Sequence, residues 1–454
     1  MTDDNITLSR RTLLGGMAGI GLAAGALGTG TYALLSDTES SADNTITAGT
    51  LNLKVDGQNS VSETINISSA GSGSSGSGTA TLSNTGSTHG KLGFGIENVE
   101  NFEGANPESE SGDTSNPGEL DQYVWVEVGV IQNGVKVPGV GPAPLSVLDD
   151  LSRMTGSILR AGSTATMYID WMVPDLGNDA QGDRAEFDVV IDIEERPVWS
   201  ADTVVTSGDS IQAAIDAASS GDVIEVRNGT YTGDLVIDKP LTLLSKNGAE
   251  YTKIVGDGST EPGGAPNVVV NVTSSDVTVE GFTIDGLAST QGALDIAATL
   301  SNVSVICNRL IGNGGNNLGT LQPGDYSDIE VARNVFDGAP SLMAYINGAA
   351  SGGTQSQNIT VVDNYFGGEI DSGSKLTMGF EADGGEIARN MFLTDISGAP
   401  YAQLELFGSS TTIEDNLFEV PAGGVGIRDG NSTYNNTTLR NDNAFFGDGT
   451  DVQG

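Results

Sequence analysis

An asparagine recurs about every 26 residues along the C-terminal half of the chain, each time within a similar short string. Each string alternates apolar and polar residues up to the asparagine and places Phe or Leu two positions after it in the clearest copies. The asparagines are Asn308, Asn334, Asn364, Asn390, Asn416 and Asn443, at intervals of 26, 30, 26, 26 and 27 residues. A period of this length, with two or three short strands per turn, predicts a β-solenoid.

The repeated asparagines are expected to be structural. Asparagine tolerates the left-handed backbone region, so it can turn the chain sharply between two strands. With coils stacked about 4.8 Å apart, its amide can donate to one neighbouring coil and accept from the other. The Phe or Leu that follows is expected to stack inside the core. The residues just before the asparagines, Arg333, Asp363, Arg389 and Asp415, alternate in charge, which predicts a partly exposed ladder of weak ion pairs.

The segment before the repeats begins with a predicted short helix. Asp209 or Ser210 can cap it, and Ile211 and Ile215 lie on its apolar face. Strands are predicted at 222–226 and 235–244. This opening resembles the pectin-lyase-like proteins, in which a short helix caps the first coil. The resemblance implies a right-handed parallel β-helix over residues 209–454, preceded by a linker at 196–208.

Residues 34–195 show the alternating pattern of half-buried strands instead of a long repeat. The alternating stretches are separated by Gly, Ser, Asn and Pro clusters and lie at 51–55, 61–67, 80–82, 92–96, 123–130, 164–171 and 185–193. This spacing predicts an antiparallel β-sandwich, with room for a short helix between residues 144 and 159. The predicted fold class is therefore all-β, a sandwich followed by a solenoid.

Two runs in this region carry a family resemblance. "TYALLSDTESSADNTITAGTLNLKV" at 31–55 and "TLSNTGSTHGKLGFGI" at 81–96 resemble the TasA/camelysin family, whose signal peptides are of the SipW-dependent type. The resemblance implies a jelly-roll-like sandwich and extracellular fibres, in which the mature N-terminus adds a strand to the next subunit. Residues 34–47 would be that donor strand. The Gly/Ser loop at 68–78 departs from the family pattern.

Camelysin relatives have been called metalloproteases, but this chain has no His-Glu-x-x-His motif. Its one histidine, His89, lies in a turn composition, and its one cysteine, Cys307, excludes an intramolecular disulfide. These counts exclude His-based acid–base catalysis and His-rich zinc sites. Metal delivery is disfavoured for the same reason, and no cofactor is expected apart from the option of Ca²⁺.

Acidic side chains outnumber basic ones by 60 to 19, which gives a net charge of −41. The acids are spread along a chain that is 37% hydrophobic, which excludes a disordered acidic tail. Molar salt shortens the Debye length to about 3 Å and screens the self-repulsion of such a surface. The composition therefore predicts a salt-adapted globular protein and excludes nucleic acid and anionic membranes as partners.

Arg10 and Arg11 precede a weakly hydrophobic run, rich in Gly and Ala, that ends near Leu35. This pattern predicts a twin-arginine export signal at 1–33, cleaved near Ala33, with an uncleaved membrane anchor as the alternative. The protein is therefore expected at the cell surface or outside the cell, with no stable membrane span after cleavage. Eight glycosylation sequons permit surface glycans, at Asn66, Asn228, Asn271, Asn302, Asn358, Asn431, Asn435 and Asn436.

One predicted solenoid face carries the candidate site. Strands at 342–347, 376–382, 403–407 and 425–428 are expected to point Ile346, Phe380, Leu406 and Ile427 inward. Their outward neighbours include the candidate catalytic residues Glu381, Glu405 and Arg428 and the candidate sugar contacts Tyr345, Asn347 and Phe407. Paired carboxylates can hydrolyse glycosides, or hold Ca²⁺ while an arginine abstracts a proton in uronate elimination.

The favoured hypothesis is a non-catalytic extracellular protein that displays a β-helix for adhesion, matrix formation or glycan binding. The alternative is a secreted polysaccharide lyase or glycoside hydrolase that acts on acidic polysaccharide through the β-helix face. The repeats contain no Gly-His-Gly motif, Asp-Asp pair or tight Asp cluster, which favours the first hypothesis.

Overall fold

The computed structural model describes the chain in segments separated by gaps. The described residues are 53–57, 65–68, 72–103, 118–174, 180, 183–197, 199–257, 268–286, 292–297, 299–313, 316–319, 326–339, 342–346, 356–368, 370, 376–394 and 402–454. The predicted export signal (1–33), the predicted donor strand (34–47) and Asn347 lie outside them. Within these segments, none of the helices has the length and apolar character needed to cross a bilayer.

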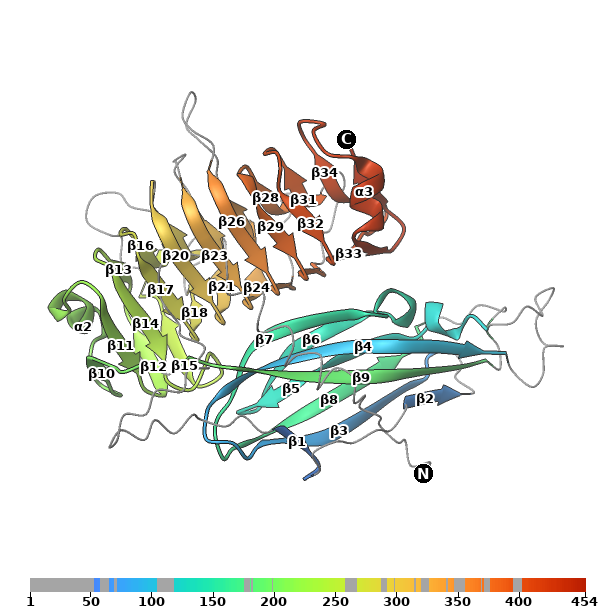
Figure 1. Cartoon of the computed structure of the whole chain (residues 1–454), viewed down its shortest axis with the longest axis horizontal. Coiled ribbons are helices and arrows are strands. Elements are labelled where there is room, and N and C mark those ends of the chain that lie inside the picture. The colour runs from blue at the N-terminus through green and yellow to red at the C-terminus, as the bar shows by residue number, and fades with distance from the viewer. Residues whose placement is uncertain are drawn as a thin grey trace, which may run out of the picture.

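Two antiparallel sheets form the N-terminal domain (Figure 1). The five-stranded sheet has the order β1 (Leu53–Val55), β3 (Ser75–Asn84), β8 (Thr164–Met172), β5 (Trp125–Gln132) and β6 (Val135–Pro144). The four-stranded sheet has the order β2 (Ile65–Ser68), β9 (Arg184–Glu195), β4 (Gly90–Phe102) and β7 (Leu151–Leu159). Two 3-10 turns, η3 (Leu120–Gln122) and η4 (Leu145–Val147), connect strands. The predicted β-sandwich is confirmed, whereas its membership of the TasA/camelysin family stays a prediction.

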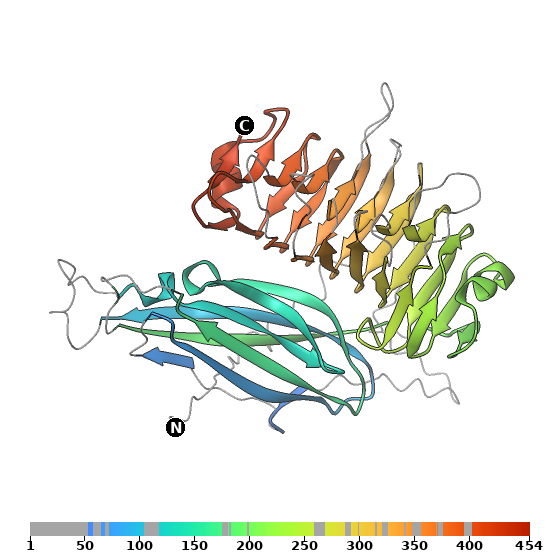
Figure 2. The same cartoon turned by 180° about the vertical axis from the view of Figure 1, so that it is seen from behind.

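The C-terminal domain is a right-handed parallel β-helix built from three nine-stranded sheets (Figure 1, Figure 2). The first solenoid sheet contains β10 (Thr203–Val205), β11 (Asp222–Val226), β14 (Leu241–Ser245), β17 (Val277–Glu280), β20 (Ser301–Ile306), β23 (Ser327–Ala332), β26 (Gln357–Val362), β29 (Asp383–Ala388) and β32 (Thr412–Glu414). The second contains β12 (Gly229–Thr232), β15 (Thr252–Val255), β18 (Thr283–Asp285), β21 (Arg309–Asn313), β24 (Val335–Ala339), β27 (Tyr365–Phe366), β30 (Met391–Phe392), β33 (Leu417–Glu419) and β35 (Ala444–Phe446). The third contains β13 (Leu235–Ile237), β16 (Val268–Val272), β19 (Gly292–Ile296), β22 (Leu318–Gly319), β25 (Ala344–Ile346), β28 (Leu376–Phe380), β31 (Ala402–Leu406), β34 (Val425–Asp429) and β36 (Thr450–Gln453). The first sheet begins with β10, inside the segment predicted to be a linker.

Short helices lie at the two ends of the solenoid, and aromatic rings fill its interior. Helix α2 (Ile211–Ala217) is capped by Ser210, whose hydroxyl accepts a hydrogen bond from the Ala213 backbone N–H. Helix α3 (Asn436–Asn441) lies near the C-terminus. Between them the predicted Phe stack is present, with ring centroids 4.5–5.1 Å apart along Phe336, Phe366, Phe392, Phe418 and Phe445.

The asparagines form a continuous buried ladder between the first and second solenoid sheets. Asn390 shows the pattern, since its Nδ2 donates to Val361 O at 2.8 Å and to Asn416 Oδ1 at 2.9 Å. Its Oδ1 accepts from the backbone N and the Nδ2 of Asn364, both at 3.0 Å. These bonds join three coils, so the predicted amide ladder is present.

The turn itself is made one residue earlier than we expected. The residues with left-handed φ are those before the asparagines: Cys307, Arg333, Asp363, Arg389 and Asp415, with φ between 54° and 59°. The asparagine side chain instead spans the corner and bonds the coils on either side. The expectation that the asparagine itself takes the left-handed conformation was therefore wrong by one residue. The asparagine contributes its side-chain amide to the ladder, and the preceding residue makes the turn.

The sandwich packs against the corner that carries this ladder and against the outer side of the second solenoid sheet. The hydrophobic core of the sandwich includes outward-pointing side chains of that sheet, among them Tyr365, Met391 and Leu417. Trp125 of β5 meets Phe446 of β35 edge to face, with centroids 5.4 Å apart. At Gly156 of β7 the backbones come so close that a Cβ would lie 2.8 Å from Cys307 Cα. The edge strand β7 of the four-stranded sheet is thus in direct contact with the solenoid.

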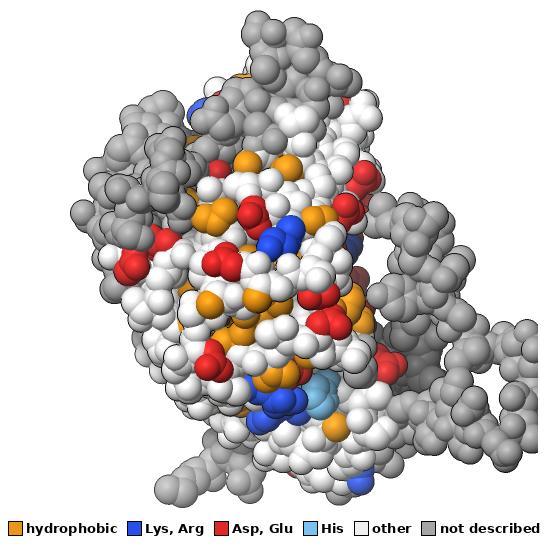
Figure 3. All heavy atoms as spheres, turned by 90° about the vertical axis from the view of Figure 1, so that its left-hand side faces the viewer, with side chains coloured by type: hydrophobic (Ala, Val, Ile, Leu, Met, Phe, Trp, Pro, Cys, Tyr) orange, Lys and Arg blue, Asp and Glu red, His pale blue; other side chains and the backbone are white. Residues whose placement is uncertain are grey.

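Basic side chains gather at the junction of the two domains although acids dominate the composition. The face in Figure 3 shows scattered acidic side chains and a group of Lys and Arg beside the histidine. Burial lowers the pKa of His89, and the charges of Arg196, Arg160 and Lys246 lower it further. His89 Nδ1 accepts a hydrogen bond from the Ala161 backbone N–H at 3.2 Å, which gives this side chain a structural role in the sandwich.

A buried charge cluster fixes the point where the chain passes from sandwich to solenoid. Glu280 of β17 pairs with Arg196 at 3.0 Å and with Lys91 of β4 at 3.5 Å. All three residues are at most 5% exposed. Arg196 also donates to the carbonyls of Ser245 and Lys246, which ties the end of the sandwich to the first solenoid sheet.

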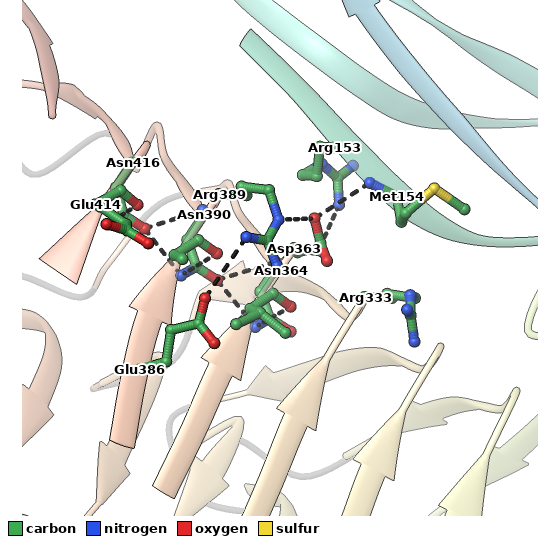
Figure 4. A network of polar contacts seen from close by, with 12 residues as sticks. Arg153, Met154, Arg333, Asp363, Asn364, Glu386, Arg389, Asn390, Glu414 and Asn416 are labelled. Atoms are coloured by element: carbon green, nitrogen blue, oxygen red, sulfur yellow. Dashed lines mark hydrogen bonds and ion pairs between the residues drawn. The ribbon is translucent and has the colours of Figure 1, made fainter. Parts of the chain in front are cut away.

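A second polar network crosses the interface at the asparagine corner (Figure 4). Arg153 of β7 is 1% exposed and donates to the Gly139 and Asp363 carbonyls, both at 2.8 Å. Asp363 Oδ1 accepts from Arg389 Nε at 3.2 Å and from the Met154 backbone N at 3.3 Å. The predicted charge ladder therefore exists between Asp363 and Arg389, but Asp363 is buried beneath the sandwich. Arg333 pairs with Glu194 of β9 instead.

Candidate functional site

The outer face of the third solenoid sheet brings most of the predicted site residues together. In one row across this sheet, Tyr345 lies opposite Gly379, Gly379 opposite Glu405, and Glu405 opposite Arg428. Glu381 lies two residues after Gly379, and Phe407 lies two residues after Glu405. The predicted inward residues Ile346, Phe380, Leu406 and Ile427 are all buried. We call Tyr345, Glu381, Glu405, Phe407 and Arg428 the third-sheet strip.

Glycine lets the aromatic rings of the strip lie flat on the sheet. A Cβ at Gly379 would lie 2.5 Å from the Tyr345 ring, and one at Gly430 would lie 2.9 Å from the Phe407 ring. Each ring therefore covers a neighbouring glycine and leaves its other side turned away from the sheet. Both side chains are only partly buried.

Each carboxylate of the strip already has a partner. The Tyr345 hydroxyl donates to Glu381 Oε1, and Arg428 Nη1 lies 3.3 Å from Glu405 Oε1. Burial raises the pKa of Tyr345, and its bond to Glu381 raises it further, so the hydroxyl stays protonated. Among the described residues there is no group of three or more His, Cys, Asp or Glu that could hold a metal ion. The strip offers aromatic faces and oriented polar groups.

A second site, which the sequence did not reveal, lies between the two domains. A cleft of about 440 Å³ separates the β5–β6 hairpin of the sandwich from the first coils of the second solenoid sheet. The charged residues that line it are Lys136, Glu250, Lys253, Arg309 and Arg333. The hairpin is also anchored here, since Asn133 Nδ2 donates to the Glu250 carbonyl at 2.8 Å.

A signal for this cleft exists in the outward row of the second solenoid sheet. The row begins with polar residues and then becomes apolar, running through Thr230, Lys253, Thr283, Arg309, Val335, Tyr365, Met391, Leu417 and Ala444. The apolar part joins the core of the sandwich, whereas the polar part lines the cleft. In the sequence, the residue directly after each repeated asparagine shows the same change from polar to apolar, starting with Arg309 and Val335.

Glu250 is the acidic residue among the described lining residues of the cleft. Burial raises its pKa to about 7, and the lowering contributions of Ser157 and Arg309 are smaller. The Ser157 hydroxyl donates weakly to Oε1 at 3.4 Å, while Oε2 is buried and has no hydrogen-bond partner in the described part of the chain. The side chain as a whole keeps some contact with solvent. Near neutral pH this carboxyl can therefore act as a donor as well as an acceptor.

Replacing Glu250 by Gln should raise stability above pH 7 and leave it nearly unchanged near pH 4. Below the usual pKa of a glutamate, the carboxyl is neutral in both the native and the unfolded protein, so it does not lower the free energy of unfolding at that pH. As the pH rises toward 7, only the unfolded chain ionises freely, so the native protein loses up to about 3 kcal/mol, an upper limit because of residual solvation. Urea denaturation of both proteins at pH 4, 6 and 8 measures this. An equal difference at all three values would contradict it.

No protein-family model and no curated relative matches this chain. Three solved pectin methylesterases show limited structural similarity, each at 14% identity. The enzyme from Aspergillus niger covers 57% of this chain and 88% of its own, with a TM-score of 0.36. The carrot enzyme covers 57% and 85%, with a TM-score of 0.37, and PemA from Erwinia chrysanthemi covers 55% and 89%, with a TM-score of 0.32. Likeness of this degree assigns no activity, so the chemistry of this chain rests on its own residues.

Proposed function

We propose that this is an extracellular surface protein whose β-helix binds glycan through the third-sheet strip. The observation that supports it is the pair of flat aromatic rings, Tyr345 and Phe407, on one face, with Glu405 on the coil of Phe407 and Arg428 on the next coil. Aromatic rings pack on the apolar faces of sugars, and fixed polar groups select their hydroxyls. A solenoid face is regular and long, which suits a polymer better than a small molecule.

The strip favours binding over catalysis and favours a neutral polysaccharide. Its two carboxylates and one arginine leave it net negative, which opposes an acidic polymer. A general acid or nucleophile must be available to the substrate, but Glu381 is held by Tyr345 and Glu405 by Arg428. The alternative remains a lyase or hydrolase in which Glu381 and Glu405 act as a carboxylate pair on either side of a bound sugar.

Self-assembly through residues 34–47 is part of this proposal, and the sandwich edges support it. Within the described residues, β2 pairs with only the first four residues of β9 (184–187). Similarly, β1 pairs with only the last three residues of β3 (82–84). Among the described residues, the rest of both strands has no partner on that side and would accept an added strand, whereas β7 at the opposite edge contacts the solenoid.

Replacing Phe407 by Ala should weaken binding to a neutral polysaccharide about tenfold, because one ring in contact with sugar contributes roughly 1.4 kcal/mol. Affinity electrophoresis in gels containing neutral or acidic polysaccharides measures the change. Phe102→Ala is the matched control, since its ring lies in the sandwich over Arg184, at 4.1 Å, and its loss should not alter binding.

The same preparations decide between binding and catalysis. Incubation with acidic polysaccharides, with and without Ca²⁺, is expected to leave the polymer intact. Unsaturated products or new reducing ends that disappear in Glu381→Gln or Glu405→Gln would replace the binding function by the enzymatic alternative. Equal mobility of the native protein in gels with and without every polysaccharide tested would reject glycan binding.

A further inference from the structure

The cleft between the domains differs in charge from the rest of the molecule. Four of the five charged residues in its described lining are basic, in a chain where acids outnumber bases threefold. Each basic residue has an acidic partner that is not among the described lining residues: Asp170 for Lys136, Asp285 for Lys253, Asp337 for Arg309 and Glu194 for Arg333. Each of these ion pairs engages a terminal nitrogen of the cation, Nζ of lysine or Nη2 of arginine, and leaves Nε of Arg309 and Arg333 outside the pair.

Three buried polar atoms of lining residues have no hydrogen-bond partner among the residues that the structure describes. They are Arg309 Nε, Arg333 Nε and Glu250 Oε2. A buried donor or acceptor without a partner costs about 1–3 kcal/mol, so such a group in the lining of a cleft points to a ligand that would bond to it. Two of the three are guanidinium donors, which bind carboxylate, sulfate and phosphate oxygens most strongly.

The remaining lining gives the cleft the character of a sugar site. Thr230 and Thr283 carry hydroxyl groups on this lining, the Thr283 hydroxyl being held by a bond that it donates to the Ala249 carbonyl at 2.8 Å, and Tyr251 also lines the cleft. Arg160 lies 5.3 Å from the centre of the Tyr251 ring, which fixes one side of it. A volume of about 440 Å³ holds one or two sugar rings, within the range of small-molecule sites.

We propose that this cleft binds an acidic sugar, with Arg309, Arg333 and Lys253 holding its oxyanion and Glu250 donating a hydrogen bond to it. The site is independent of the third-sheet strip, because it lies on a different solenoid sheet and takes an acidic sugar, whereas the strip favours a neutral one. The oxyanion chemistry is shared by uronates and sulfated sugars, and the test separates them.

Titration of the full-length protein at one fixed salt concentration tests the site. The probes are glucuronate, galacturonate and glucose 6-sulfate, with glucose as the neutral control, and calorimetry reports Kd. Arg309→Gln should weaken binding of the acidic probe roughly tenfold to a hundredfold, as expected for loss of a charge-assisted hydrogen bond. Lys253→Gln provides a second variant at a more exposed position. Arg184→Gln changes the net charge equally at a distant surface pair and should bind normally.

The pH dependence supplies an independent readout. Glu250 faces Ser157 of β7 and Arg309 of β21, and the other charged groups lining the cleft are Lys136, Lys253 and Arg333. Binding in the native protein should weaken as the pH rises through 7, because Glu250 then loses its proton and places a negative charge beside the bound oxyanion. Glu250→Gln should bind with no such change.

The titrations distinguish results that support the cleft site from results that overturn it. Binding of uronates alone, or of the sulfated sugar alone, identifies the oxyanion and supports the site. Binding of no acidic probe, or equal binding by Arg309→Gln, Lys253→Gln and the native protein, overturns it. Phe407→Ala should bind acidic probes normally, so failure of glycan binding on the third-sheet strip does not affect this result.

Discussion

Replacing Asn390 by Ala should lower the free energy of unfolding by about 4 kcal/mol, since several buried groups each lose a hydrogen bond at once. Its Nδ2 bonds to Val361 O, Ala388 O and Asn416 Oδ1, and its Oδ1 accepts two bonds from Asn364. The side chain is 0% exposed, so water cannot replace these bonds without opening the corner.

The loss should extend beyond the substituted coil. Each asparagine is bonded to the next from Asn308 to Asn443, and such chains of buried hydrogen bonds strengthen one another. The solenoid transmits stability between neighbouring coils, so one broken rung weakens the interfaces on both sides. Hydrogen exchange should therefore show faster exchange at the Asn364 and Asn416 amides as well.

Guanidinium denaturation measures the effect, with Asn441→Ala as the control. Asn441 lies in α3 and is exposed, so its replacement should change the free energy of unfolding by less than about 0.5 kcal/mol. A loss at Asn390 no larger than that at Asn441 would show that the ladder is dispensable. Retained glycan binding by the folded variant is also expected, because the ladder lies away from the third-sheet strip.

The solenoid could be predicted because its determinants are local and repeated. Asn390 bonds within its own coil and to the two adjacent ones, and Phe392 stacks on Phe366 and Phe418 in the same register. Any sequence that repeats such contacts must show their period. The left-handed residue was placed one position late, because Arg389 has no side-chain feature that favours positive φ, and only the ladder geometry assigns it.

The candidate site was predictable only as far as side-chain alternation allows. Alternation placed Tyr345, Glu405 and Arg428 on one outer face, and the register confirms this. The Tyr345–Glu381 and Arg428–Glu405 contacts depend on side-chain reach across coils, which the sequence does not encode locally. The cleft depends on which solenoid sheet the sandwich covers, a tertiary property that follows from residues more than a hundred positions apart.

Replacing Glu280 by Gln should destabilise the protein by about 3–5 kcal/mol, the cost of breaking a buried ion pair while leaving its cations in place. Lys91 and Arg196 are each 5% exposed and lose the negative charge that they share. Glu186→Gln is the control, because the Arg184–Glu186 pair is partly exposed and should contribute less than about 1 kcal/mol.

The pH dependence of Glu280→Gln identifies the cause. Burial alone would raise the pKa of Glu280, but the charges of Lys91 and Arg196 outweigh it and lower the pKa. The stabilisation is therefore present above the usual pKa of a glutamate and is lost as the pH falls through the lowered value. The difference between native protein and variant should be full at pH 7 and should shrink in acid. A difference that stays constant down to the acid transition would indicate lost packing, and two separate unfolding transitions in the variant would show that this cluster couples the sandwich to the solenoid.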